Sequence, residues 1–334
     1  DRFWVAGTTI EGAALILMAL AALLLDGAVA GWAIIICLAV FSLGRGVASI
    51  AQKDVLGKTI AKTRRGTVSG YAGTIASLGT GAFGLYLSAR GTTASMSFFP
   101  ILLGVAAVLF LSAAAAFARL DEQPGATEGG GNAIDFTKRE LRRLNDDPAF
   151  ARFITARSLF VATALMPPYL VSLLQQSEGA GIFDLGQLIL ASGIAGGLSS
   201  AVWGRLADRS SRLVMMATGA LAGVTALAIA ALALVAPAAL GAPLLIPAAI
   251  FLVALAHAGM RIGRKTYIVD LAGSDRRAGY VALSNTLIGV VLLLSGLIGV
   301  FAEWAGIGLA LLLLAGLSGL GVQVAWSLPE VQED

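Results

Sequence analysis

Two long apolar segments, residues 182–204 and 213–235, flank a short stretch rich in arginine. That stretch reads Gly204-Arg205-Leu206-Ala207-Asp208-Arg209-Ser210-Ser211-Arg212. An α-helix needs about 20 residues to cross the hydrocarbon core of a bilayer, and each flanking segment is long enough. The Asp208 carboxylate can pair with a guanidinium or accept hydrogen bonds from the N-terminus of a helix. The stretch therefore predicts a polar turn between two membrane-spanning helices.

The same pattern of long apolar segments covers the whole chain. Ten segments lie at residues 4–25, 29–50, 66–88, 96–118, 150–174, 182–204, 213–235, 243–264, 278–300 and 304–327. Backbone groups in lipid must be satisfied within a segment, and barrel strands would be about half as long, so helices are expected. The composition agrees, because 57% of the residues are hydrophobic and 13% are charged. We therefore expect an all-α polytopic membrane protein with ten helices present.

The composition also argues against several functions. The chain has one cysteine, Cys37, and one histidine, His257, so neither an internal disulfide nor a common zinc site is expected. A membrane-embedded enzyme would need a nucleophile–base pair or a metal cluster. The net charge of +3 does not indicate a nucleic-acid partner. We expect no catalytic residues, no metal and no cofactor.

Basic residues gather in alternate connections between the segments. They lie between the second and third segments, around residues 119–149, and after the sixth and eighth segments. The opposite connections carry Arg90 with four acidic residues, Asp26, Glu178, Asp184 and Glu303. The positive-inside rule then places the basic connections and both termini in the cytoplasm. Arginine outnumbers lysine by 18 to 5, and alanine and glycine are abundant, which is typical of a GC-rich bacterial gene, so we expect a bacterial inner membrane.

The chain divides into two related halves. Residues 119–149 form a Gly-rich and charged linker between four segments in residues 1–118 and six in residues 150–334. Arg64 and Arg65 match Arg276 and Arg277 at an offset of 212, and Arg45 matches Arg261 at an offset of 216. The four segments thus map onto the last four of the six. This predicts a parallel repeat of six plus six helices in which the first two helices are missing.

The stretch at residues 204–212 resembles the signature loop G-x-L-A-D-R-x-x-R of the major facilitator superfamily, with Ser210 where glycine is usual. The resemblance implies that the ten helices are equivalent to helices 3–12 of that fold. It also implies that Asp208 contacts Arg261 or Arg264, and the start of the third segment near Gly66. The residues implied in the signature loop and gating are Gly204, Leu206, Asp208, Arg209, Arg212, Arg45 and Arg261. The alternative is a solvated turn that only follows the positive-inside rule.

Arg45 matches Arg261, an implied partner of Asp208. The partner of Arg45 is therefore expected to be the matching carboxylate of the first-half signature stretch, which would precede Asp1.

Two segments carry small residues at helical spacing. They are Gly66, Gly70, Gly73, Ser77, Gly81 and Gly84 in the third, and Gly193, Gly197, Ser200 and Gly204 in the sixth. Such stripes permit close helix packing. The resemblance implies that these two helices face each other across the interface between the halves. The alternative is tight packing within one half.

Polar residues inside apolar segments are candidates for a solute cavity, because burying them is costly. The cavity candidates are Arg157, Tyr169, His257, Asn285 and Gln187. Pro167 and Pro168 predict a break or kink in the fifth segment. Each candidate also has a structural alternative: Arg157 could extend to the membrane surface, and His257 and Asn285 could bond neighbouring helices. Glu11 is the candidate for proton coupling, and a structural ion pair is its alternative.

These observations and the resemblance predict a secondary transporter that moves a small solute by alternating access, and the resemblance implies proton coupling. Arg157 and Arg261 favour an anionic or zwitterionic solute. The expected partners are a small-molecule substrate and the lipid bilayer, and the protein is expected to be monomeric. Because a cavity wall is expected to be missing, we expect the chain as given not to transport. The alternative function is a non-transporting membrane sensor or partner protein on the same fold.

Overall fold

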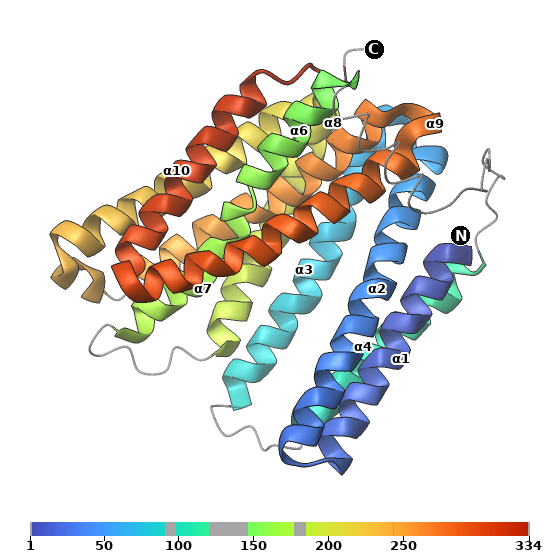
Figure 1. Cartoon of the computed structure of the whole chain (residues 1–334), viewed down its shortest axis with the longest axis horizontal. Coiled ribbons are helices and arrows are strands. Elements are labelled where there is room, and N and C mark those ends of the chain that lie inside the picture. The colour runs from blue at the N-terminus through green and yellow to red at the C-terminus, as the bar shows by residue number, and fades with distance from the viewer. Residues whose placement is uncertain (1, 91–97, 120–145, 177–184, 243, 333–334) are drawn as a thin grey trace. The chain divides into compact units, whose positions relative to one another are not determined.

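The computed structural model describes residues 2–90, 98–119, 146–176, 185–242 and 244–332. Within these residues the chain forms nine α-helices, two short 3-10 helices and no strand (Figure 1). They are α1 (Arg2–Leu24), α2 (Gly27–Thr59), η1 (Lys62–Arg64), α3 (Arg65–Arg90), α4 (Phe98–Phe117), α6 (Pro148–Leu159), α7 (Ala162–Gln176), α8 (Leu185–Val235), η2 (Pro237–Gly241), α9 (Leu245–Ala305) and α10 (Ile307–Trp326). The all-helical prediction is confirmed.

Every one of the ten predicted segments has a helical counterpart. The sixth and seventh segments are joined in α8, which is interrupted where Ser210 adopts an extended backbone (φ −159°, ψ 101°). The eighth and ninth are joined in α9, which is interrupted at Gly273 (φ 63°, ψ −173°). A residue with a Cβ rarely adopts that left-handed conformation, so glycine is required at this kink.

The fifth segment is split into α6 and α7. The break falls at residues 160–161, nearly two turns before Pro167, and both prolines lie inside α7. Proline removes the hydrogen bond to the carbonyl four residues back, which for Pro167 is that of Thr163, so the prolines alone do not place the break at residues 160–161. At the break the backbone hydrogen bonds span three residues rather than four, and Thr163 N donates to Phe160 O at 3.1 Å.

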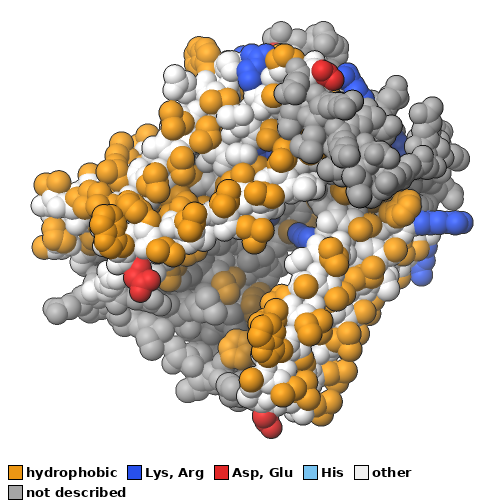
Figure 2. Space-filling view, in the orientation of Figure 1, with side chains coloured by type: hydrophobic (Ala, Val, Ile, Leu, Met, Phe, Trp, Pro, Cys, Tyr) orange, Lys and Arg blue, Asp and Glu red, His pale blue; other side chains and the backbone are white. Residues whose placement is uncertain are grey.

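The chain is a multi-pass membrane protein. Eight stretches of the described residues are long and apolar enough to cross a bilayer. α3, which is rich in glycine and serine, is not among them. Figure 2 shows hydrophobic side chains along the faces of the helices. Large apolar side chains such as Leu293 and Trp304 are 82% and 85% exposed, which suits contact with lipid.

One compact unit consists of Asp1–Thr59, Thr92–Gly130 and Ser274–Ala282. Here α1 packs on α2 and α4, with Leu15, Met18 and Ala107 buried among them. α1 and α2 approach closely, because a Cβ on Gly7 would lie 2.7 Å from the carbonyl oxygen of Gly44.

The second unit consists of Ile60–Gly91, Gly131–Gly273 and Leu283–Asp334. Its core contains fully buried side chains from four helices, including Met166, Leu170, Ile246 and Leu314. The division at residues 118 and 150 predicted from the linker remains a prediction.

Candidate functional site

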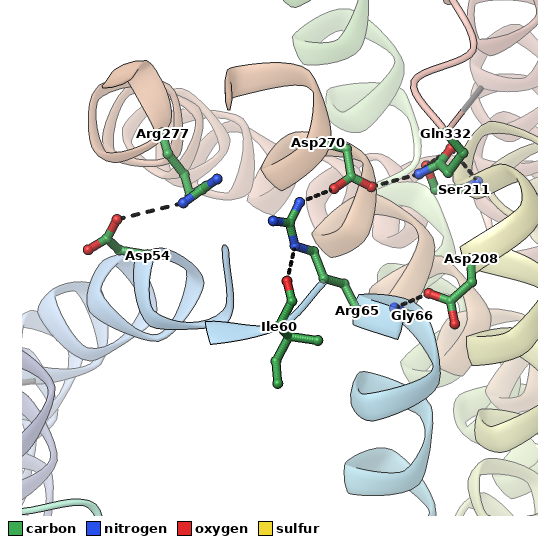
Figure 3. Close-up of polar contacts among 9 residues, drawn as sticks. All are labelled: Asp54, Ile60, Arg65, Gly66, Asp208, Ser211, Asp270, Arg277 and Gln332. Atoms are coloured by element: carbon green, nitrogen blue, oxygen red, sulfur yellow. Dashed lines mark hydrogen bonds and ion pairs between the residues drawn. The ribbon is translucent and has the colours of Figure 1, made fainter. Parts of the chain in front are cut away.

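The Asp208 carboxylate binds the N-terminus of α3. Its Oδ1 accepts a hydrogen bond from Gly66 N at 2.5 Å, and its Oδ2 accepts one from Thr67 N at 2.7 Å and another from Thr67 Oγ1. The first backbone N–H groups of a helix have no partner within the helix and carry partial positive charge, so a carboxylate suits them. The predicted contact near Gly66 is therefore present (Figure 3). Pairing with Arg264 is not found among the described residues, and pairing with Arg261 remains a prediction.

From this cap toward the C-terminus of α3, α3 and the first half of α8 pack through their small residues. A Cβ on Gly204 would lie 2.5 Å from Gly66 O, and one on Gly70 would lie 2.5 Å from Ser200 O. Further along, a Cβ on Gly193 would overlap the backbone of Gly81. The two stripes thus face each other with the backbones in contact, as the resemblance implied.

The interruption of α8 at Ser210 is tied to the C-terminal residues. Ser210 Oγ accepts from Leu213 N at 3.1 Å, so it caps the second half of α8, and it also donates to Glu330 Oε2 at 2.5 Å. Arg212 donates to Leu328 O at 2.9 Å and lies 3.7 Å from Glu330. The stretch predicted to be a solvated turn or a latch is thus held on two sides, by α3 and by residues 327–332.

Asp270 is an ion-pair residue that sequence reasoning missed. Its fully buried carboxylate pairs through Oδ1 with Arg65 Nη1 at 2.5 Å, and its Oδ2 accepts from Gln332 Nε2 at 2.8 Å (Figure 3). Arg65 also donates from Nε to Ile60 O at 3.0 Å. Gln332 bridges onward to Ser211, whose backbone N–H donates to Gln332 Oε1 at 3.1 Å. One carboxylate therefore joins the start of α3, the middle of α9 and the C-terminal residues.

A related ion pair lies in the first unit. Asp54 on α2 is 4.0 Å from Arg277 and also pairs with Lys58. Asp54 and Asp270 are separated by 216 residues, the offset that relates Arg45 to Arg261, and Arg65 and Arg277 are separated by 212. The internal repeat could have identified both pairs. The two aspartates are related by the same offset as Arg45 and Arg261, and the two arginines are related by the offset of 212 already found in the sequence.

Arg45 has a partner that differs from the predicted one. Its Nη1 lies 3.4 Å from Oε1 of Glu11, which is buried within the first unit. This contact supports the structural alternative for Glu11, while its role in proton coupling remains a prediction. The pairing was missed because Glu11 and Arg45 lie on different helices, and only the packing of α1 on α2 brings them together.

Arg157 on α6 is held inside the second unit by neutral groups of α9. Its Nη1 donates to Ser284 Oγ, and its Nη2 donates to Asn285 Oδ1 at 3.2 Å. The guanidinium is therefore directed toward α9, and whether it contacts a solute remains a prediction. Two cavity candidates, Arg157 and Asn285, are thus in direct contact.

His257, Arg261 and Arg264 lie on α9 at spacings of four and three residues, which puts them on one helical face. His257 and Arg264 are half-buried and Arg261 is exposed. Electrostatic interactions link Arg264 to both Arg157 and His257. These four candidates therefore form one basic cluster, which we call the α6–α9 cluster.

The remaining candidates lie elsewhere or outside the described side chains. Tyr169 lines a pocket of about 420 Å³, together with Glu303 and residues of α7, α9 and α10. Leu206 and Arg209 are exposed on α8. Gln187 lies on α8, but its side chain is outside the described part of the structure. Whether any of these residues contacts a solute remains a prediction.

A multi-pass helical bundle with repeat-related ion pairs and a close interface of small residues is typical of a membrane transporter. A family model described as Major Facilitator Superfamily matches residues 2–290, and the chain belongs to this family. Members of this family are membrane transporters of small molecules and not enzymes, so the chain is a membrane transporter with a small-molecule substrate. A comparison with curated protein sequences gives no match.

Solved structures support the same fold. The crystal structure of the Major Facilitator Superfamily transporter FucP in the outward conformation is 15% identical with a TM-score of 0.67, covering 98% of this chain and 83% of that one. A bacterial homologue of the iron transporter ferroportin, in the outward-facing state, is 16% identical with a TM-score of 0.65, covering 97% and 84%. The human organic anion transporter TETRAN is 12% identical with a TM-score of 0.60, covering 96% and 80%. At these identities the likeness concerns the fold alone.

Proposed function

We propose that the protein is a secondary active transporter that moves a small solute by alternating access. In this proposal it works as a monomer in a bacterial inner membrane, with the signature stretch and both termini in the cytoplasm. Glu11, paired with Arg45, is the proposed proton-coupling residue. Repeat-built transporters expose a central site by rocking one part of the bundle against another.

The observation that carries the proposal is the cap of α3 by Asp208. A carboxylate on one helix accepts three hydrogen bonds from the end of another helix that belongs to the other sequence repeat. The neighbouring backbones are in contact through small residues, so at these positions the two helices pack closely without interlocking side chains. A contact that is polar, local and reversible at one end of such an interface is suited to a gate.

The energy of this gate is large enough to set a conformational equilibrium. A hydrogen bond to a charged group contributes about 1.5–3 kcal/mol. Asp208→Asn keeps one carbonyl acceptor and loses the charge and the second acceptor. We therefore expect the capped state to lose about 2–4 kcal/mol, which is a shift of roughly 30-fold or more in the equilibrium constant.

Spin-label distance measurements on the full chain in nanodiscs test the proposal. Cys37→Ser removes the single native cysteine. One label pair at Thr63 and Arg209, both exposed, reports on the capped end, and a second pair at Ala82 and Ser192, also exposed, reports on the far end. In the Asp208→Asn variant, the first pair should gain a longer distance while the second pair gains a shorter one.

Asp26→Asn is the matched control, because it makes the same chemical change at an exposed carboxylate. It should leave both distance distributions as in the parent. If Asp208→Asn leaves both pairs unchanged, the cap is not a gate. If both pairs lengthen together, the variant has loosened the helices without exchanging access, and alternating access is refuted.

A further inference from the structure

The α6–α9 cluster concentrates basic groups inside the second unit. Arg157 comes from α6, while His257 and Arg264 come from α9 at a spacing of seven residues, which is two helical turns. Arg264 acts electrostatically on both Arg157 and His257, and Arg261 acts on His257 and Arg264. The groups that face one another across this site are therefore basic.

No described carboxylate neutralises the core of the cluster. Arg264 makes no hydrogen bond or ion pair with any described residue, and His257 makes none either. The bonds of Arg157 go to the neutral groups of Ser284 and Asn285, and its buried Nε has no acceptor among the described residues. His257 Nδ1 is likewise buried without a described partner.

Basic groups without a carboxylate partner destabilise the folded protein, so their presence here calls for a function. An uncompensated charge in a membrane protein costs several kcal/mol, and intramembrane basic residues normally pair or line a solute path. The site contrasts with two other arginines of the second unit, Arg65 and Arg212, which both have carboxylate partners. Guanidinium groups present paired N–H donors that match the two oxygens of a carboxylate or phosphate.

We propose that Arg157, His257 and Arg264 bind the carboxylate or phosphate group of the transported solute, so that the substrate class is a small organic anion. The assignment to a transported solute rests on the proposed function. Ser284 and Asn285 orient the Arg157 guanidinium by holding two of its nitrogens. Arg261, exposed one turn from His257, adds positive charge at the approach to the site.

Thermal unfolding of the full chain in a neutral detergent, followed by tryptophan fluorescence, tests anion binding. The probes are sodium phosphate and sodium succinate, with sodium chloride at the same ionic strength as reference. At least one oxyanion should raise the unfolding midpoint of the parent above that in chloride. In Arg264→Gln, the concentration for half of this shift should rise about tenfold or more, because a charged contact is lost.

A second readout separates loss of the site from loss of the fold. Without added anion, Arg264→Gln should unfold at the same or a higher temperature than the parent, because the substitution removes an uncompensated charge. Arg64→Gln is the matched control: Arg64 is exposed, so the variant should keep the parent's anion titration. If neither anion protects the parent, or if Arg264→Gln titrates like the parent, the proposal is refuted.

The source of the anionic group and the transport step are tested separately. If phosphatidylglycerol protects and both soluble anions fail, the cluster binds a lipid headgroup and the solute assignment is refuted. The protecting anion should also show counterflow in proteoliposomes, which would overturn the expectation that the chain as given does not transport. Binding without counterflow refutes the assignment of the anion as a substrate of this chain. The spin-label experiment uses no solute, so failure of alternating access is distinguishable from failure of the anion site.

Discussion

The ion pairs Arg65–Asp270 and Arg277–Asp54 occupy repeat-related positions, yet the structure predicts unequal energies. At the first pair the atoms are 2.5 Å apart, and the side chains are 11% and 0% exposed. At the second pair they are 4.0 Å apart, Asp54 is 26% exposed, and Lys58 shares the same carboxylate. A double-mutant cycle at each pair measures the difference.

The magnitudes follow from burial. Removing one member of a buried pair leaves an uncompensated charge and costs about 3–5 kcal/mol, whereas removing both members costs far less. Asp270→Asn keeps an acceptor for Gln332, so the coupling energy isolates the ion pair. We expect a coupling of about 2–4 kcal/mol for Arg65–Asp270, and of about 0–1 kcal/mol for the longer, partly exposed Arg277–Asp54 pair.

The assay is equilibrium unfolding of the full chain in mixed micelles for the parent, Arg65→Gln, Asp270→Asn and the double variant. The cycle with Arg277→Gln and Asp54→Asn serves as its internal comparison. A coupling energy for Arg65–Asp270 that does not exceed that of Arg277–Asp54 would refute the reasoning, because burial and geometry would then not set the strength of these contacts.

The remaining predictions concern one glycine and one acid. Gly204→Ala places a Cβ 2.5 Å from Gly66 O, so it should lower the free energy of unfolding by about 1–3 kcal/mol. Gly79→Ala, which places its Cβ within 4 Å of no other described atom, should leave this free energy unchanged or raise it slightly. Equal effects of the two changes on the unfolding free energy would contradict the contact. Glu11→Gln should keep counterflow of the protecting anion and lose its accumulation driven by a proton gradient. If gradient-driven accumulation persists, Glu11 serves only as the partner of Arg45.

Much of the fold was predictable because the signals are local. Membrane insertion selects apolar segments of about 20 residues, and the ten predicted segments all correspond to helices. The same holds for the cap of α3, since a carboxylate in a stretch such as residues 204–212 has few partners better than a helix N-terminus. The small-residue stripes were legible too, because close packing requires small residues at helical spacing on both helices.

Which charged residues form ion pairs was much harder to predict from the sequence. Asp54 and Asp270 lie near segment ends, where charged residues are ordinary, and their importance depends on which helix end lies opposite. Arg45 was expected to pair with a carboxylate of the first-half signature stretch, and the structure places it 3.4 Å from Glu11, a contact that the sequence analysis did not predict. The involvement of Gln332 depends on the path of the last residues past Ser211 and Asp270.

By itself, then, the sequence determined the family, the helices and the two faces that pack closely. Only the tertiary structure decided which charged groups are neutralised and which are not. The physical reason is that hydrophobic length and small-residue spacing act within one helix, whereas an ion pair needs two side chains brought within a few ångströms. Arg65 begins α3 and Arg264 lies within α9, and of these two arginines Arg65 meets a described carboxylate whereas Arg264 does not.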